Sequence, residues 1–283
     1  MAGTSKWIAG FVRLMRLPNV LIIVLTQLLL RYCVVLPWLD PGKTGTIAAL
    51  PDFIVLIVVT ALISAGGYMI NDYFDVKIDL INKPGQAVIN RVVSARAAIT
   101  GHMVLNAIAL TLGAYLAWRV KSISFGLIFF LISGLLWIYS AKYKRTLLWG
   151  NLIISGLTAF VIMIVLLFEF FRLRLDPLLF ASVASELQEV AIVFAGYVLF
   201  AFLVSLVREI IKDIEDTEGD TKAGCKTLPI VAGVQTAKIL AGSILVINMI
   251  LLAFAQYKLW NQGYDAIAWY FLVTVQPVSV VFL

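Results

Sequence analysis

The sequence contains two acidic stretches of similar pattern, NDYFDVKID at residues 71–79 and KDIEDTEGD at residues 212–220. In both stretches the aspartates fall at positions i, i+3 and i+7. These aspartates are Asp72, Asp75, Asp79, Asp213, Asp216 and Asp220. On an α-helix this spacing places three carboxylates within roughly 60° of one face. Each stretch follows a long apolar run, so we expect two acidic faces at the ends of two membrane helices.

The composition is typical of a polytopic membrane protein. Of the 283 residues, 62% are hydrophobic and 13% are charged, whereas a soluble domain is about 45–50% apolar and about 25% charged. Apolar runs of about 20 residues can cross a hydrocarbon core of about 30 Å. The sequence therefore predicts an all-α helical bundle with eight spans, forming a single integral-membrane domain over residues 1–283. The expected spans are 18–36, 51–72, 97–118, 123–139, 151–171, 190–207, one ending near 256, and 266–283.

The remaining segments have distinct expected roles. Residues 1–17 carry basic and apolar side chains in alternation, which favours a short amphipathic helix at the membrane interface. Residues 73–94 read as a polar loop, because Lys83-Pro84-Gly85 is a turn signal. A hydrophilic linker around Asp176-Pro177 separates the fifth and sixth spans.

Several other classes of protein and site are disfavoured. The two cysteines are far apart in sequence, which argues against a disulfide framework. A single histidine, His102, excludes a multi-histidine metal or haem site. Basic residues are scattered over short loops rather than striped, so nothing indicates nucleic-acid binding. No obligate protein partner is indicated, and the first apolar stretch lacks the features of a cleavable signal peptide.

The distribution of positive charge predicts the orientation of the chain. With eight spans, the amino terminus and the loops after spans two, four and six share one side. That side has about twice as many lysines and arginines as the other, which makes it cytoplasmic by the positive-inside rule. We therefore expect residues 71–96 and 208–228, as two acidic loops, to form a cap on the cytoplasmic face of the cytoplasmic membrane.

Six aspartates beside hydrocarbon favour a metal site. Ionised carboxylates there are strongly disfavoured unless they are solvated, paired or metal-bound. Solvated charges would explain one such triplet, but two copies with the same spacing favour a common site. Oxygen ligands suit Mg²⁺, which usually binds a few carboxylates together with substrate phosphates. Two facing triplets could thus hold Mg²⁺ ions and a diphosphate, helped by basic residues on the same face. These are Lys144, Arg145, Arg208 and Lys212.

At these residues the sequence resembles the UbiA-type superfamily of intramembrane prenyltransferases. That family carries an Asn-Asp-x-x-Asp-x-x-x-Asp motif after its second helix and an Asp-x-x-x-Asp-type motif after its sixth. The further similarities are Arg16-Leu17-Pro18-Asn19, Tyr139-Ser140 with Lys144-Arg145, and Lys226-Thr227-Leu228-Pro229. The resemblance implies nine helices around a central cavity with a lateral opening to lipid, of which this sequence shows eight.

The resemblance also implies a reaction and a set of site residues. Mg²⁺ bound by the six aspartates would hold a prenyl diphosphate, and ionisation would give an allylic carbocation that a lipophilic acceptor attacks. The implied catalytic residues are Asn19, Asp72, Tyr139, Lys144 and Asp213. The implied substrate-binding residues are Asn71, Lys144, Arg145, Arg208 and Lys212. A tyrosine face can stabilise a cation, although Tyr139 also suits an interfacial anchor and Asn19 a helix cap.

The acceptor is open at this stage. The run over residues 208–220 is most similar to the branch that makes digeranylgeranylglyceryl phosphate, which implies geranylgeranyl transfer to geranylgeranylglyceryl phosphate in ether lipid synthesis. Many family members read Asn-(Lys/Arg)-Pro-x-Arg-Pro after the first motif, whereas here Asn82-Lys83-Pro84 is followed by Gly85 and the nearest arginine is Arg91. Prenylation of an aromatic acceptor (a quinone, homogentisate or a porphyrin derivative) is the main alternative. A cation channel or transporter is a more remote alternative.

Overall fold

A computed structural model of the protein describes residues 2–40, 50–82, 85, 88–261, 263, 265, 269 and 272–273. Nearly all of these described residues are helical, and the only pairing of extended backbone among them is an isolated bridge between Ile89 and Val93. The predicted all-α class is therefore confirmed.

Seven helical segments of the described chain are long and apolar enough to cross a membrane. They are α2 with η1 and α3 (Leu17–Leu29, Leu30–Val35, Leu36–Leu39), α4 (Leu50–Asn82), α5 (Ala95–Arg119), α6 (Ile123–Ala141), α7 (Trp149–Leu173), α9 (Ala184–Glu215) and α12 (Val234–Asn261). The sequence predicts eight spans, so the described residues fall one short of that count. The eighth predicted span, residues 266–283, lies almost entirely outside them.

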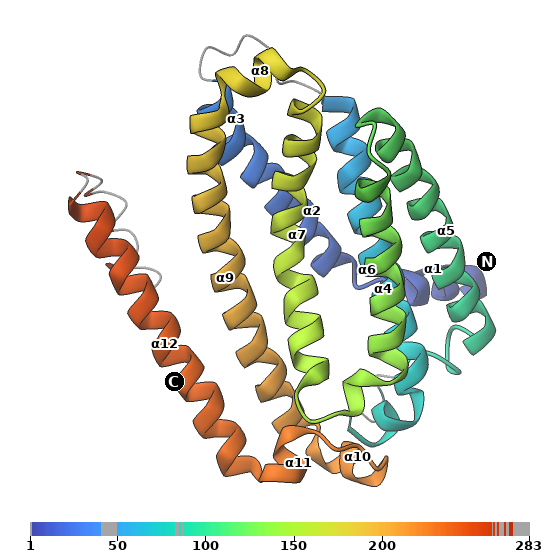
Figure 1. Cartoon of the computed structure of the whole chain (residues 1–283). Helices are drawn as coiled ribbons and strands as arrows, with labels where there is room; N and C mark the ends of the chain where they lie inside the picture. The colour runs from blue at the N-terminus through green and yellow to red at the C-terminus, as the bar shows by residue number, and fades with distance from the viewer. Residues whose placement is uncertain are drawn as a thin grey trace.

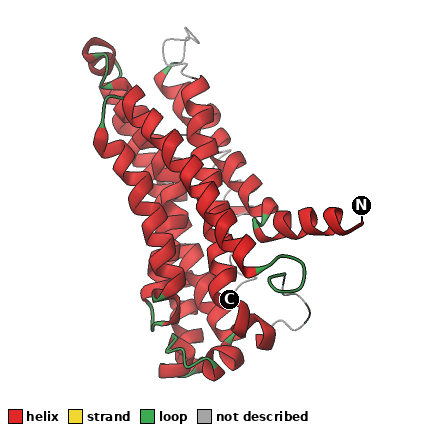
Figure 2. Cartoon of the chain, turned by 90° about the vertical axis from the view of Figure 1, so that its right-hand side faces the viewer, coloured by secondary structure: helices red, strands yellow, loops and turns green. Residues whose placement is uncertain are grey.

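Short helices join or flank these spans. They are α1 (Ala2–Leu14), η2 (Tyr143–Arg145), α8 (Pro177–Ser182), α10 (Thr217–Lys222) and α11 (Leu228–Ala232). Helix α1 runs across the axis of the bundle (Figure 2) and exposes Trp7 and Ile8. This orientation agrees with the predicted interfacial helix, because such a helix lies in the plane of the membrane.

The largest apolar core closes one half of the bundle. It contains five fully buried or nearly fully buried phenylalanines. These are Phe53, Phe125, Phe129, Phe168 and Phe194. A second, smaller apolar cluster joins α9, α11 and α12 at the opposite end, where α10 and α11 also lie (Figure 1).

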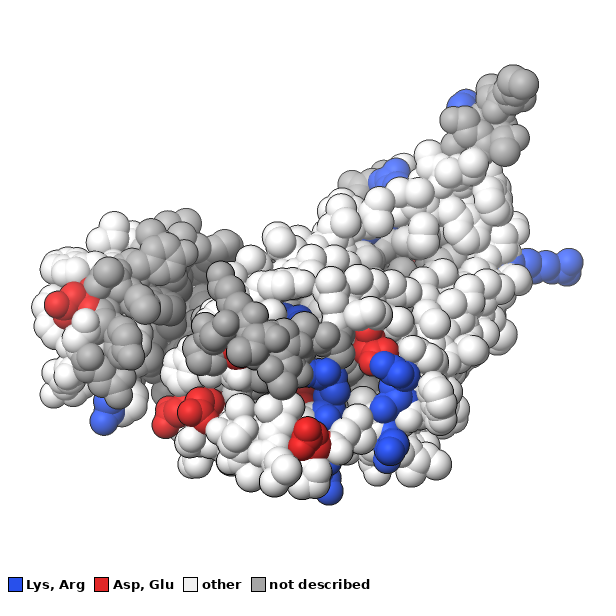
Figure 3. Space-filling view, turned by 90° about the horizontal axis from the view of Figure 1, so that it is seen from above, with Lys and Arg blue, Asp and Glu red and all other residues white. Residues whose placement is uncertain are grey.

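The end of the bundle away from α10 and α11 has a mostly uncharged surface. Viewed from that end, charged side chains gather along one part of the rim (Figure 3). One of the ion pairs here joins Arg119, at the end of α5, to Asp52, at the start of α4, with 2.8 Å between the guanidinium and the carboxylate. The acidic stretches are at the other end of these helices.

The prediction that residues 73–94 form a polar loop is wrong for its first ten residues. Helix α4 continues through them to Asn82, just before the proline at position 84. The aspartates recur with helical spacing, so the polar residues extend the membrane helix instead of ending it. The second stretch is also mostly helical, because α9 reaches Glu215 and α10 follows at once. The predicted acidic loops are thus largely the protruding ends of helices.

Candidate active site

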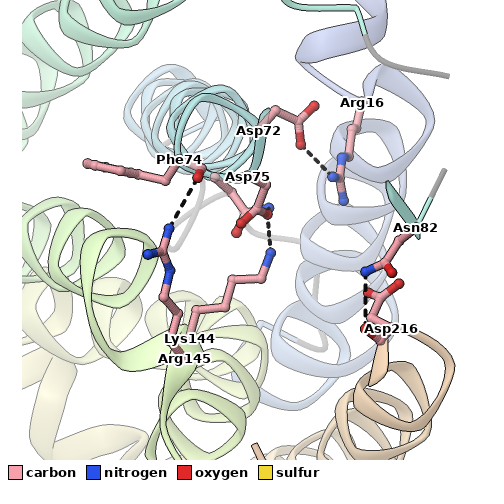
Figure 4. Close-up of polar contacts among 9 residues, drawn as sticks. Arg16, Asp72, Phe74, Asp75, Asn82, Lys144, Arg145 and Asp216 are labelled. Atoms are coloured by element: carbon pink, nitrogen blue, oxygen red, sulfur yellow. Dashed lines mark hydrogen bonds and ion pairs between the residues drawn. The ribbon is translucent and has the colours of Figure 1, made fainter. Parts of the chain in front are cut away.

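The two acidic stretches meet at one end of the bundle, and Asn82 connects them. Asn82 is the last residue of α4 and lies beside the start of α10 (Figure 4). Its side-chain oxygen accepts a hydrogen bond of 2.7 Å from the backbone N–H of Gly219. Its side-chain nitrogen donates one of 3.1 Å to the backbone carbonyl of Asp216. One amide therefore fixes the second stretch relative to the first.

Residues from both stretches line a small cavity of about 30 Å³, the acidic cavity. Five of the six predicted aspartates contribute to it, together with the predicted substrate-binding residues Asn71, Lys144 and Lys212. Its polar lining residues are Arg16, Asn71, Asp75, Asp79, Tyr139, Lys144, Asn151, Glu209, Lys212, Asp213, Asp216 and Asp220. The structure thus brings together residues that are up to 204 positions apart in sequence, from Arg16 to Asp220.

Lys144 reaches into this cavity from η2, between α6 and α7. Its ammonium donates a hydrogen bond to the carboxylate of Asp75, and the side-chain amide of Asn71 donates a hydrogen bond of 2.9 Å to the same oxygen. Burial lowers the pKa of Lys144, but the charge of Asp75 and the nearby Tyr139 outweigh this effect, and the net pKa is raised above its ordinary value. Lys144 is therefore a permanent cation among the carboxylates.

The position of Lys144 depends on a glycine at the start of α7. A Cβ atom at Gly150 would lie 2.7 Å from the carbonyl oxygen of Tyr143 and 2.9 Å from the Cα of Lys144. Only a residue without a side chain lets η2 approach α7 this closely. The next residue, Asn151, donates 2.8 Å to the carboxylate of Asp213. The start of α7 thus orients groups in both acidic stretches.

Two further charged residues differ in their surroundings. Glu209 is buried, lines the acidic cavity and pairs with Arg208 at 3.0 Å. Asp220 lies in α10, where burial and the charge of Asp216 raise its pKa.

Two predicted site residues, Asp72 and Arg145, line neither the acidic cavity nor the larger cavity beside it. Asp72 points towards Arg16, with 2.7 Å between the carboxylate and the guanidinium (Figure 4). Burial lowers the pKa of Arg16. The charge of Asp72 and its hydrogen bond raise that pKa and outweigh burial, so the net pKa is above its ordinary value. Arg145 is exposed and donates 3.3 Å to the backbone carbonyl of Phe74. In this conformation Asp72 and Arg145 contact other parts of the protein.

A larger cavity of about 410 Å³ lies next to the acidic cavity, and we call it the deep cavity. Both cavities are lined by the same five polar or aromatic residues at their common border. These are Arg16, Asn71, Tyr139, Glu209 and Lys212. Asn19 and Arg208 also line the deep cavity, and most of its remaining lining is aliphatic or aromatic. Every predicted residue except Asp72 and Arg145 thus lines one cavity or the other.

Sequence reasoning assigned no role to several residues that the structure places in the site. Asn82, Gly150, Asn151 and Glu209 are the main examples. Two of them carried a signal. Asn151 is a polar residue at the start of an apolar span, and Glu209 is four residues before Asp213, on the same helical face.

The donor set suits Mg²⁺ only in combination with a phosphate. Among the described residues, no three acidic, histidine or cysteine side chains converge closely enough to hold a metal ion. Mg²⁺ is commonly held by one or two carboxylates plus substrate phosphates, so it does not need such a group. Carboxylate and amide oxygens are abundant here. The aspartates that would hold the ion are Asp75, Asp79, Asp213, Asp216 and Asp220.

Comparison with known proteins defines the class. Residues 21–283 match the UbiA prenyltransferase family, and the chain belongs to this family. It is 32% identical to digeranylgeranylglyceryl phosphate synthase of Thermococcus gammatolerans over 71% of this chain and 65% of that protein. It is 31% identical to the synthase of Methanobrevibacter smithii over 83% of this chain and 75% of that protein. The matched part of this chain thus spans just under two thirds of the first relative's length.

Solved structures show the same fold. A digeranylgeranylglyceryl phosphate synthase structure superposes with a TM-score of 0.61 at 20% identity, covering 97% of this chain and 91% of that chain. A UbiA homologue from Archaeoglobus fulgidus, bound to GPP and Mg²⁺, gives 0.60 at 17% identity, covering 96% and 85%. At these identities the likeness concerns the fold alone.

Proposed function

We propose that this protein transfers a prenyl group from a prenyl diphosphate to a lipophilic acceptor within the membrane. One observation carries the proposal: an acidic cavity with a fixed ammonium directly borders an apolar cavity, and five residues line both. A prenyl diphosphate has this division, with a polyanionic head and a hydrocarbon tail. Membership of the prenyltransferase family supports the same reaction.

The acidic cavity would bind the diphosphate. Mg²⁺ held there by the aspartates would neutralise the charge that develops on the leaving diphosphate. Lys144 supplies positive charge inside the acidic cavity, Lys212 lies at its border with the deep cavity, and the Asn71 amide can donate to a phosphate oxygen. Fixed donors of this kind act mainly in the transition state, because they meet the charge as it forms.

The deep cavity would hold the reacting carbon. When the carbon–oxygen bond to the diphosphate breaks, the electron pair leaves with the diphosphate and an allylic cation remains. The ring of Tyr139, at the border, can stabilise this cation through its face. The acceptor hydroxyl then forms the new carbon–oxygen bond and loses its proton. Glu209, whose carboxylate lines both cavities, would accept this proton. The apolar walls exclude water, which would otherwise capture the cation.

We propose geranylgeranyl transfer to geranylgeranylglyceryl phosphate as the specific reaction. An acceptor phosphate needs a basic site, and the polar end of the deep cavity carries Arg16, Arg208 and Lys212. The names of the relatives support this acceptor. An aromatic acceptor would require no such anion site. A cation channel is disfavoured, because the aspartates of the two acidic stretches lie at one end and a large apolar core occupies the other half.

We also propose that the acidic end is the cytoplasmic cap of a protein in the cytoplasmic membrane. The seven apolar helices support a membrane location, and the excess of positive charge at this end supports the orientation.

An assay with the full chain in lipid vesicles tests the reaction. Geranylgeranyl diphosphate is supplied with Mg²⁺ and either geranylgeranylglyceryl phosphate, its dephosphorylated analogue or an aromatic acceptor, and products are identified by mass. We expect digeranylgeranylglyceryl phosphate and release of diphosphate, with little product from the analogue. Equal use of the dephosphorylated acceptor would argue against a phosphate site, and product only from the aromatic acceptor would overturn the assignment.

A further inference from the structure

The inner end of the deep cavity can be identified from the directions of the helices. Helices α2, α4 and α7 each contribute one lining residue furthest from the acidic end. These are Thr26 on α2, Thr60 on α4 and Ile164 on α7. On α6, which runs in the opposite direction to α7, the corresponding residue is Phe129. The four helices agree, so the end of the cavity furthest from the acidic stretches lies near Thr60.

A hydrogen-bonded pair of side chains lies at this end. The hydroxyl of Thr60 can donate a hydrogen bond to the side-chain oxygen of Gln27, 2.8 Å away, and it also lies 3.1 and 2.9 Å from the backbone carbonyls of Leu56 and Ile57. The side-chain nitrogen of Gln27 in turn donates a hydrogen bond of 3.3 Å to the backbone carbonyl of Val161. Gln27 is completely buried. We call Thr60, Gln27 and the Val161 carbonyl the polar floor, and it links α2, α4 and α7.

An ion pair lies one helical turn beyond the polar floor. Arg31, four residues after Gln27, donates to the carboxylate of Glu169. Both side chains are at most 1% exposed, and the Arg31 guanidinium lies 4.4 Å from the ring centre of Phe53. The region beneath the floor is therefore occupied by charged groups that a hydrocarbon chain cannot replace without a large loss of pairing.

We propose that the polar floor sets the maximum length of the prenyl chain that the deep cavity accepts. This inference rests on the proposed prenyl transfer and adds the residues that select the donor. An apolar floor could yield by a change of rotamer. A hydrogen-bonded floor resists, because displacing it would deprive the buried Gln27 side chain of its partners in an apolar environment.

The depth of the cavity fits a chain of defined length. Eleven residues of α4 separate Thr60 from Asn71, which corresponds to about 17 Å of helix axis. An extended chain advances roughly 1.2 Å for each covalent bond, so an isoprene unit of four bonds spans about 5 Å. Three extended isoprene units therefore fit between the diphosphate site and the floor. A four-unit chain of about 20 Å fits only when it is bent, and a five-unit chain of about 25 Å would collide with the floor.

A lateral exit for the tail is the competing arrangement. Ile22 lines the deep cavity and is 63% exposed on the outside of the bundle. A tail that left between the helices at this point would not reach the floor. Changes at Thr60 or Gln27 would then leave donor selection unchanged, so the two arrangements give opposite results in one experiment.

The experiment is a competition between donors in lipid vesicles containing the full chain. Equal amounts of diphosphates with three, four and five isoprene units are supplied with one acceptor, and the ratio of products is measured by mass. Because all products come from one sample, their ratio does not depend on how much protein is folded. The test variants are Thr60→Leu, which raises the floor, and Thr60→Ala combined with Gln27→Ala, which lowers it.

Thr158 provides the matched control. It lines the side of the same cavity, and its hydroxyl donates 2.9 Å to the backbone carbonyl of Ile154. We expect Thr60→Leu to favour the three-unit over the four-unit donor by about tenfold, and the double variant to favour the five-unit donor by about tenfold. Thr158→Leu and Thr158→Ala should leave the ratios within about twofold of the parent.

Unchanged product ratios in both floor variants would overturn the inference and support the lateral exit. Equal shifts in the floor and Thr158 variants would also overturn it, because selection would then be a general property of the cavity wall. The absence of prenylated product from every donor in the parent protein is a different result. That outcome would refute the proposed prenyl transfer itself.

Discussion

The ammonium of Lys144 contacts the carboxylate of Asp75 in the acidic cavity that both acidic stretches line. Lys144 belongs to the short connection between α6 and α7, and Asp75 to the protruding end of α4 (Figure 4). A cation from a third segment thus lies at the site where the two aspartate triplets approach each other. It lowers their mutual repulsion and provides positive charge for a diphosphate that arrives there.

This contact predicts a kinetic effect for Lys144→Ala. If Lys144 stabilises the departing diphosphate, its loss should lower kcat by roughly 10²-fold, with a smaller rise in KM for the prenyl diphosphate. The measurement is steady-state kinetics in vesicles at saturating Mg²⁺. Lys142→Ala is the control, because Lys142 is exposed and does not line either cavity. Equal kinetics in the two variants would assign Lys144 to membrane anchoring.

Binding of Mg²⁺ should depend on diphosphate. No three acidic side chains of the described residues converge well enough to hold the ion alone, so phosphate oxygens must complete its coordination. We expect Mg²⁺ alone to change the melting temperature little. Mg²⁺ with inorganic diphosphate at about 100 times its Kd should stabilise the folded state by about 2.7 kcal/mol. The same shift with Mg²⁺ alone would indicate a preformed metal site.

Removal of the metal should abolish activity reversibly. We expect excess chelator to stop product formation, and added Mg²⁺ to restore it, with the melting temperature of the diphosphate-free protein unaffected throughout. Ca²⁺ provides a comparison, because it prefers more ligands at longer distances than Mg²⁺. Activity that survives complete chelation would contradict the proposed role of the aspartates as magnesium ligands.

The connection through Asn82 predicts coupled losses of stability and activity. Asn82→Ala removes two hydrogen bonds between α4 and α10, at a cost of about 1–3 kcal/mol. Gly219→Ala should have a similar effect, because a Cβ there would overlap the Asn82 amide. Thermal unfolding and kcat should fall together in both variants. Glu218→Gln, on the exposed side of α10, should change neither measurement.

Periodicity and charge in the sequence were sufficient to predict the helical class, the positions of most spans and the convergence of the acidic stretches. The spacing of the aspartates follows helical geometry, which is local and can be read directly. The continuation of α4 to Asn82 was missed, because polar residues after an apolar run resemble a loop unless their helical spacing is given priority.

Contacts between segments that are distant in the chain could not be predicted from the sequence. The pairing of Asp72 with Arg16 depends on where α1 ends relative to α4. The role of Gly150 depends on the close approach of η2 to α7. Neither relationship has a periodic signature, because each arises from the packing of segments that are folded separately. The polar floor is a third case, since Gln27 and Thr60 read individually as isolated polar residues in apolar spans.

The orientation of the site in the membrane can be measured by accessibility of introduced cysteines. Arg91 and Lys222 are exposed residues near the acidic end, and Lys121 is exposed at the end of the bundle where α5 finishes. Each is changed to cysteine in a chain in which the exposed Cys33 is replaced by serine. We expect a membrane-impermeant thiol reagent to label Arg91→Cys and Lys222→Cys only from the cytoplasmic side, and Lys121→Cys only from the other. The reason is that the excess of positive charge at the acidic end keeps that end in the cytoplasm.

The buried Cys225 serves as an internal control and should stay unlabelled until the protein is denatured. Labelling of positions 91 and 222 from opposite sides would contradict a shared site, whereas labelling of both from outside would retain the site and reverse the orientation.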